Sequence, residues 1–155
     1  MRGKEKKLRR GIEVFLLCGI AVLAVFLLTR PQRNLIHVSD VTSVRTDGTS
    51  VTYHAAMDLL RNINDFGGRR CTVGKNYPAK DYEDIIEIRC EDGIRYELHY
   101  WYTSGFSFHP AHFGEDAYAS ILTRFAADGT AESAWRLVYE FDAAYRDWEK
   151  HYLSH

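Results

Sequence analysis

The sequence predicts an α+β protein: an N-terminal transmembrane helix followed by a small antiparallel sheet that is covered by about three helices. Three observations lead to this prediction. A basic segment precedes an unbroken apolar run near the N-terminus, a β-hairpin pattern with a clear turn lies in the middle of the chain, and apolar residues recur at helical spacing on both sides of that hairpin. The 155 residues suffice for one domain of ordinary size.

The N-terminal segment has the layout of a signal anchor. Residues 1–10 form a basic tail with six Lys or Arg side chains against one Glu, and residues 14–28 are fifteen apolar residues without a break. A helix over residues 11–29 is just long enough to cross a bilayer. The preceding cations place the tail in the cytoplasm, so that residues 30–40 form a stalk and residues 41–155 an extracytoplasmic domain of a single-pass cell-membrane protein. A cleaved signal peptide has the same layout and is the alternative.

The charge of the remaining chain excludes one class of partner. From Arg30 onward the sequence has 14 basic and 19 acidic side chains, a net charge of −5. Binding to nucleic acid relies on clustered basic residues that neutralise phosphates. We therefore expect no nucleic-acid partner for the domain.

Two cysteines lie outside the apolar run, Cys71 and Cys90. Two cysteines in an extracytoplasmic domain predict one disulfide, which at this loop length stabilises a fold by about 3 kcal/mol. Two buried free thiols are the alternative.

The first elements of the domain follow from simple patterns. Residues 41–48 alternate weakly and end in a turn signal, which predicts a strand. Apolar residues then recur at helical spacing, with Ser50 as the expected cap and Gly67 as the stop, which predicts a helix of about 13 residues.

The segment from residue 84 to residue 102 predicts a β-hairpin. A three-residue loop over residues 91–93, with Gly93 in the left-handed conformation, aligns Ile88 with Tyr96 and places apolar side chains on one face. The same register aligns Cys90 with Ile94 and Ile86 with Leu98. The opposite face then carries Ile85, Glu87, Arg89, Arg95, Glu97, His99 and Trp101.

The C-terminal third predicts two helices, over residues 113–128 and 130–152, because apolar residues repeat there at spacings of three and four. A hairpin over residues 118–141 is the competing interpretation. The length of the last helix would allow its end to project aromatic side chains toward a partner, but docking of this stripe on the chain's own sheet is the favoured interpretation. These side chains are Tyr145, Trp148 and Tyr152.

The aromatic loop over residues 103–113 and the hairpin face beside it are the first candidate site. Long loops with exposed aromatic residues are typical of recognition surfaces, so we expect a non-catalytic module that binds a partner protein or surface ligand. The candidate residues are Glu87, Glu97, His99, Trp101, Phe106 and Phe108. The alternative is that Phe106 and Phe108 belong to a core strand.

A metal site is the second candidate. His99, His109 and His112 could bind zinc with a position left open for water, as in a zinc-dependent hydrolase. However, His109 precedes Pro110, which forces an extended backbone there, and the sequence has no recognisable nucleophile motif. We therefore expect no cofactor and no catalytic residue, with zinc hydrolysis as the alternative function.

Overall fold

The structure is a computed structural model of the chain and describes residues 2–73, 84–103 and 117–153. The chain divides into two compact units, residues 1–30 and residues 31–155. The first unit is a single helix, α1 (Arg2–Thr29), on which large apolar side chains such as Phe15 are exposed. Within the described residues, no helix combines the length and apolar character needed to cross a membrane, so the span over residues 11–29 stays a prediction.

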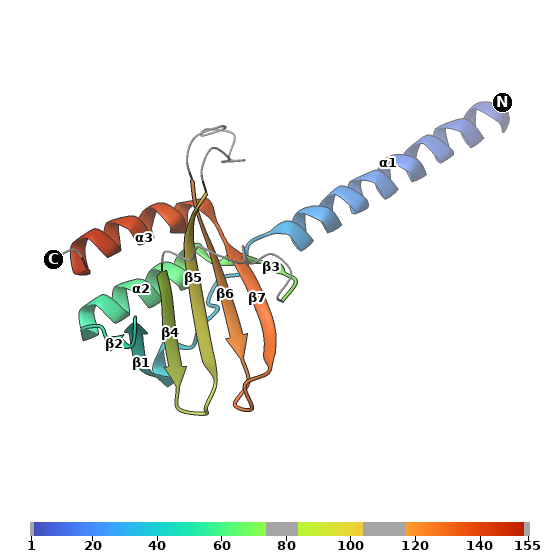
Figure 1. Cartoon of the computed structure of the whole chain (residues 1–155). Helices are drawn as coiled ribbons and strands as arrows, with labels where there is room; N and C mark the ends of the chain where they lie inside the picture. The colour runs from blue at the N-terminus through green and yellow to red at the C-terminus, as the bar shows by residue number, and fades with distance from the viewer. Residues whose placement is uncertain (1, 74–83, 104–116, 154–155) are drawn as a thin grey trace. The chain divides into compact units, whose positions relative to one another are not determined.

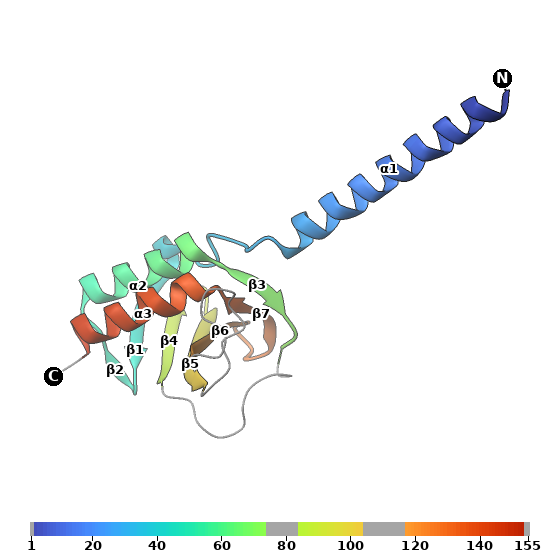
Figure 2. The ribbon, with the colours of Figure 1, turned by 90° about the horizontal axis from the view of Figure 1, so that it is seen from above.

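The second unit is an antiparallel sheet of seven strands in the order β2-β1-β4-β5-β6-β7-β3, with two α-helices on one face (Figures 1 and 2). The strands are β1 (Val41–Thr46), β2 (Thr49–Ser50), β3 (Gly68–Cys71), β4 (Asp84–Cys90), β5 (Arg95–Thr103), β6 (Ala117–Phe125) and β7 (Ala131–Leu137). The helices are α2 (Tyr53–Phe66) and α3 (Tyr139–Tyr152), and a 3-10 turn, η1 (Val38–Asp40), precedes β1. The α+β class and the antiparallel sheet are confirmed, but the sheet is larger and carries fewer helices than predicted.

The central hairpin has the predicted register. Glu87 lies opposite Glu97 and Ile88 opposite Tyr96, while the Cys90 amide donates to the Ile94 carbonyl at 2.9 Å across the turn. Gly93 has φ +80°, which only glycine adopts without strain. The alternation of apolar and charged residues therefore predicted the register of β4 against β5 correctly.

Helix α2 begins two residues later than the sequence suggested. Its N-cap is Thr52, whose hydroxyl accepts from the Ala55 amide at 3.4 Å, so the expected cap at Ser50 was wrong. Ser50 ends β2 instead. Gly67 ends the helix as predicted, with φ 70° and its amide donating to the Ile63 carbonyl at 2.9 Å.

The C-terminal third differs most from the prediction. Residues 117–125 and 131–137 form a β-hairpin, β6–β7, in place of a helix over residues 113–128 and the first half of a helix over residues 130–152. The competing hairpin over residues 118–141 was thus the better interpretation. Ile121 and Leu122 are both buried, on opposite faces of β6, and this removes the alternation that would have revealed a strand.

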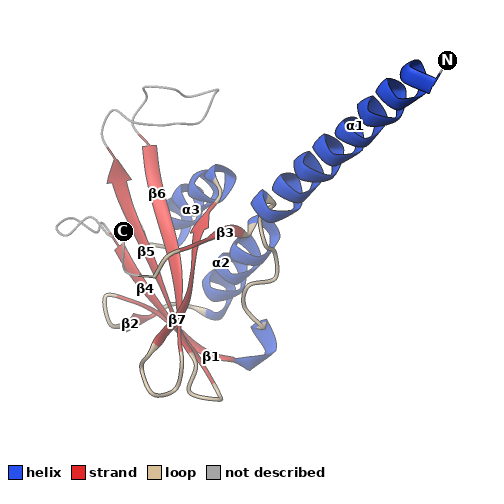
Figure 3. Ribbon diagram, turned by 90° about the vertical axis from the view of Figure 1, so that its right-hand side faces the viewer, coloured by secondary structure: helices blue, strands red, loops and turns tan. Residues whose placement is uncertain are grey.

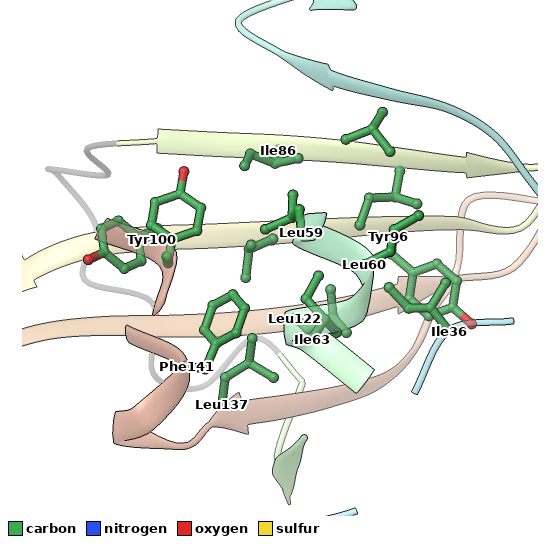
Figure 4. Close-up of a cluster of buried hydrophobic side chains, with 14 of the residues drawn as sticks. Ile36, Leu59, Leu60, Ile63, Ile86, Tyr96, Tyr100, Leu122, Leu137 and Phe141 are labelled. Carbon is green, nitrogen blue, oxygen red and sulfur yellow. The ribbon is translucent and has the colours of Figure 1, made fainter. Parts of the chain in front are cut away.

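The main core lies between the sheet and its two helices (Figures 3 and 4). Leu59, Leu60 and Ile63 of α2 meet Leu98 and Leu122 of the central strands, all with at most 1% exposure. Burying a side chain of this size contributes about 1.5–3 kcal/mol. The helices α2 and α3 of the domain thus cover the apolar face of its own sheet.

Helix α3 docks on the sheet and on α2. Tyr145 and Trp148 are 0% and 3% exposed, and the Trp148 indole donates to the Ala55 carbonyl at 2.7 Å. The Tyr152 hydroxyl donates to Asp58 at 2.6 Å. Docking of Tyr145 and Trp148 on the chain's own sheet is therefore confirmed, although the helix is shorter than predicted, with 14 residues.

The predicted disulfide was also wrong: Cys71 and Cys90 are free thiols. Three strands separate β3 from β4 in the sheet, which at about 4.8 Å per step puts the two residues on the order of 19 Å apart, whereas bridged cysteines need Cα atoms about 4.4–6.8 Å apart. Cys90 packs against the main core, and Cys71 packs against Ala119, Ile121 and Ala134 on the other face.

Candidate functional site

The two faces of the sheet carry different chemistry. Neither α2 nor α3 covers the second face, which we call the helix-free face (Figure 3). The strand register places Arg45 beside Glu87, Glu87 beside Glu97, and Arg89 beside Arg95 on neighbouring strands of this face. Its part over β1, β4 and β5 is therefore charged, although it lies in the middle of the sheet.

Five side chains of this face, two arginines, two glutamates and one histidine, form one continuous network. The Arg89 guanidinium donates to Glu87 at 2.5 Å, and Arg95 lies 3.7 Å from Glu87 and 3.2 Å from Glu97. His99 Nε2 lies 3.2 Å from the second oxygen of Glu97. The Arg95 guanidinium also stacks over the Phe125 ring, 4.7 Å from its centroid.

The two opposed glutamates are neutralised by two arginines. The hydrogen bond from Arg89 lowers the pKa of Glu87, so this carboxylate stays ionised at neutral pH. An ionised carboxylate held between two guanidinium groups is a poor general acid or base near neutrality. The network is therefore suited to charge complementarity rather than to proton transfer.

Arg45 extends the network toward the edge of the sheet. Its Nε is shielded from solvent and has no hydrogen-bond partner among the described residues. An unpaired buried donor costs free energy that a partner with an acceptor group would recover. Arg45 thus adds a hydrogen-bonding capacity that the described part of the domain does not use.

The structure brings together three of the predicted site residues, Glu87, Glu97 and His99. Trp101 lies in β5 opposite Ala119, although its side chain is outside the described set. Phe106 and Phe108, together with the loop over residues 104–113, lie outside the described residues, so their role stays a prediction.

The predicted metal site is described at one position alone. His109 and His112 lie outside the described residues, and the side chain of His99 is 13% exposed and contacts Glu97. Among the residues that the structure does describe, no three His, Cys, Asp or Glu side chains converge as metal ligands. The zinc alternative stays a prediction.

A buried carboxyl group was missed from the sequence. Asp142, in the first turn of α3, is 2% exposed and accepts a hydrogen bond from the Ser120 hydroxyl of β6 at 2.6 Å. Arg136 of β7 lies 3.8 Å from its other oxygen and donates to the Ser120 carbonyl at 2.9 Å. Burial raises the pKa of Asp142 to about 7, partly offset by Arg136. Because residues 113–128 were assigned to a helix, no sequence signal paired Ser120 with Asp142.

A second buried polar contact lies beside it. The Tyr145 hydroxyl donates to Asp84 of β4 at 3.0 Å, and its ring lies 4.0 Å from the ring of Tyr100, centroid to centroid. Burial raises the pKa of both Tyr145 and Asp84. These contacts attach α3 to the central strands. They give the Tyr145 hydroxyl and the Asp84 carboxylate a structural role.

A groove of about 620 Å³ lies between η1, β1 and α2. Its lining is mostly apolar and includes Val38, Val51, Met57 and Leu60. No charged side chain lines it, and its polar side chains are those of Ser39, Thr42, Ser43 and Tyr53.

No known protein family, curated protein or solved structure matches the chain. The function therefore has to be argued from the faces and contacts of the domain itself.

Proposed function

We propose that the chain is a membrane-anchored, non-catalytic binding module that recognises a partner protein through the helix-free face of its sheet. In this proposal α1 holds the domain at the outer face of the membrane. The charged network on β4 and β5 is the contact surface, and Trp101, Phe106 and Phe108 extend it.

The anchor is supported by the sequence and by the side chains of α1. Residues 14–28 contain no polar side chain other than Cys18, and residues 11–27 of the helix are exposed throughout. Apolar surface of this extent is rare on a protein surrounded by water and is normally covered by lipid or by another protein. The basic residues before the run favour a cytoplasmic N-terminus.

The observation that carries the binding role is the charged network itself. Glu87, Arg95 and Glu97 are only about a quarter to a third exposed, yet they occupy the centre of a sheet face that could have been apolar. An exposed ion pair contributes at most about 1 kcal/mol, so the four contacts among these five side chains add modestly to stability. Arranged charges do set the orientation and specificity of protein contacts.

The proposal can be tested by crosslinking in membranes. The full-length chain would carry a photo-crosslinking residue in place of Ile85, which is 41% exposed on the helix-free face. We expect a discrete crosslinked product that is lost when Arg89→Glu and Glu97→Arg are introduced together, since this double exchange keeps the net charge but inverts the pattern.

The matched control exchanges two charges on the helix side, Asp65→Arg and Lys150→Glu, both at exposed positions. This control should keep the crosslinked product. A product that survives the exchange on the helix-free face, or one that both variants lose equally, would rule out the network as the contact surface.

A further inference from the structure

We infer that the partner of the helix-free face is the same face of a second copy of this chain. This inference rests on the proposed function, because it identifies the partner of the surface proposed there. The charge pattern of this face is complementary to itself.

The charges on the central hairpin are arranged in two parallel rows. Glu87 and Glu97 face each other across β4 and β5 and form an acidic row, and Arg89 and Arg95 face each other one step along and form a basic row. Successive residues on one face of a strand are two positions apart, so the rows lie roughly 6.7 Å apart.

Such a pair of rows matches its own image under two-fold symmetry. A two-fold axis that lies between the rows and runs parallel to them brings the acidic row of one copy onto the basic row of the other. Glu87 then meets Arg89 of the second copy, and Glu97 meets Arg95 of the second copy. Because the contact is isologous, each Glu–Arg pair occurs twice.

The neighbours of the two rows also fit this arrangement. Arg45 continues the acidic row on β1 and Ser43 continues the basic row, so the symmetry places Arg45 against Ser43 of the second copy. The arginine thereby meets a neutral side chain of the second copy rather than another cation. On β6, Thr123 is buried and Phe125 is uncharged, so β6 adds no charge to either row.

The area of the charged face predicts a weak dimer. Three strands about 4.8 Å apart (β1, β4 and β5) and about seven residues along each give a flat area on the order of 300 Å². Stable interfaces bury about 800 Å² of accessible surface per partner. We therefore expect association that depends on confinement in a membrane and weakens as salt screens the charges.

The test is a charge-exchange complementation in lipid vesicles. The full-length chain would be labelled with a donor or an acceptor fluorophore, and energy transfer would report association. One variant carries Arg89→Glu and Arg95→Glu, so both rows are acidic. The other carries Glu87→Arg and Glu97→Arg, so both rows are basic.

We expect each variant alone to associate roughly tenfold more weakly than the original chain, because like charges face each other. Mixing the two variants should restore association, since every acidic position then meets a basic one. Retention of near-UV circular dichroism shows that each variant is folded. If a double variant does not fold, the single exchanges Arg89→Glu and Glu87→Arg take its place in the same scheme.

Two results would overturn the inference: an original chain that stays monomeric in vesicles, or folded variants that show no recovery on mixing. If the Ile85 crosslink to another protein persists in either case, the proposed function stands and the self-association fails alone. If the Ile85 crosslink is lost as well, both the proposed function and the self-association are ruled out.

Discussion

The pKa of a carboxyl group is raised on one side of the sheet and lowered on the other. On the helix side, Asp142 is buried beside Ser120, and burial raises its pKa to about 7. On the helix-free side, Glu87 is held by Arg89, and its pKa is lowered. One side of the sheet thus holds a buried carboxyl group, from α3, that resists ionisation, and the other holds a surface carboxylate, from β4, that is kept ionised.

This difference separates the residues that hold the fold together from those that are available for recognition. Alternate residues of each central strand point to opposite faces. Ile86, Ile88 and Leu98 are fully buried under the helices, whereas their neighbours Glu87 and Glu97 stay accessible. Substitutions on the two faces should therefore have separable effects.

The largest expected effect comes from the helix side. Phe141→Ala removes a fully buried ring from the core and should lower the free energy of unfolding by about 3–5 kcal/mol. Urea unfolding of the full-length chain in detergent micelles, followed by tryptophan fluorescence, would measure it. The comparison on the other face is Glu97→Gln, which should stay within about 1 kcal/mol. If Phe141→Ala and Glu97→Gln lower the free energy of unfolding equally, the distinction between the two faces is wrong.

The pH dependence of stability tests the buried carboxyl group. The folded protein keeps Asp142 protonated up to about pH 7, whereas in the unfolded chain the pKa of this carboxyl group returns to its ordinary value of 3.8. Between these values the folded state binds more protons, so stability falls as pH rises. At about 1.4 kcal/mol per pKa unit, the upper limit of this loss is on the order of 4 kcal/mol.

Asp142→Asn should flatten the pH profile between about pH 4 and pH 7, measured by urea unfolding at each pH. Glu87→Gln provides the contrast, because the lowered pKa of Glu87 gives a stabilisation that is present above pH 4.5 and lost as pH falls through its folded pKa. An unchanged slope in Asp142→Asn would show that another group, such as Asp84, sets the profile.

The smallest expected effect concerns the two cysteines, which lie on different faces. We expect Cys71 and Cys90 to react as free thiols in the denatured chain without reductant, and reductant to leave the unfolding midpoint unchanged. Thiol counting by mass after alkylation checks this. A mass that shows the two thiols bridged to each other would contradict the strand order, since no small movement brings β3 beside β4.

The sequence predicted the central hairpin well because one of its faces is apolar and the other is charged. Ile86 and Ile88 alternate with Glu87 and Arg89, so a shift by one residue would bury the charges. The same alternation is sufficient to place Glu87, Glu97 and His99 on one face as neighbours. That part of the candidate site was therefore predictable from local sequence.

The hairpin β6–β7 was not predictable in the same way, because both of its faces are buried in part. Ala134 and Trp135 are adjacent in sequence and at most 8% exposed, as are Ile121 and Leu122. Apolar residues on both faces also satisfy helical spacing. The available signal was the turn at Asp128 and Gly129, where Asp128 accepts from the Thr130 amide at 2.8 Å.

The contact between Ser120 and Asp142 depends on three-dimensional arrangement rather than on local pattern. Ser120 lies in a strand that the sequence assigned to a helix, and Asp142 lies next to Phe141 within an apolar stripe. The Cys71–Cys90 prediction failed for a related reason, because their separation is set by strand order. Cysteine spacing alone carries no information on that order.

The strand order has a consequence for synthesis. Residues 41–71 supply β1 and β2 at one edge of the sheet, β3 at the other edge, and the helix α2, while the four strands β4 to β7 between them come from residues 84–137 (Figure 1). A chain that emerges N-terminus first thus displays α2, with its apolar stripe, before the surface that covers it has been made. Strands β1 and β2 can pair at once, but β3 and the apolar stripe of α2 have no partner until the later half of the domain has been translated.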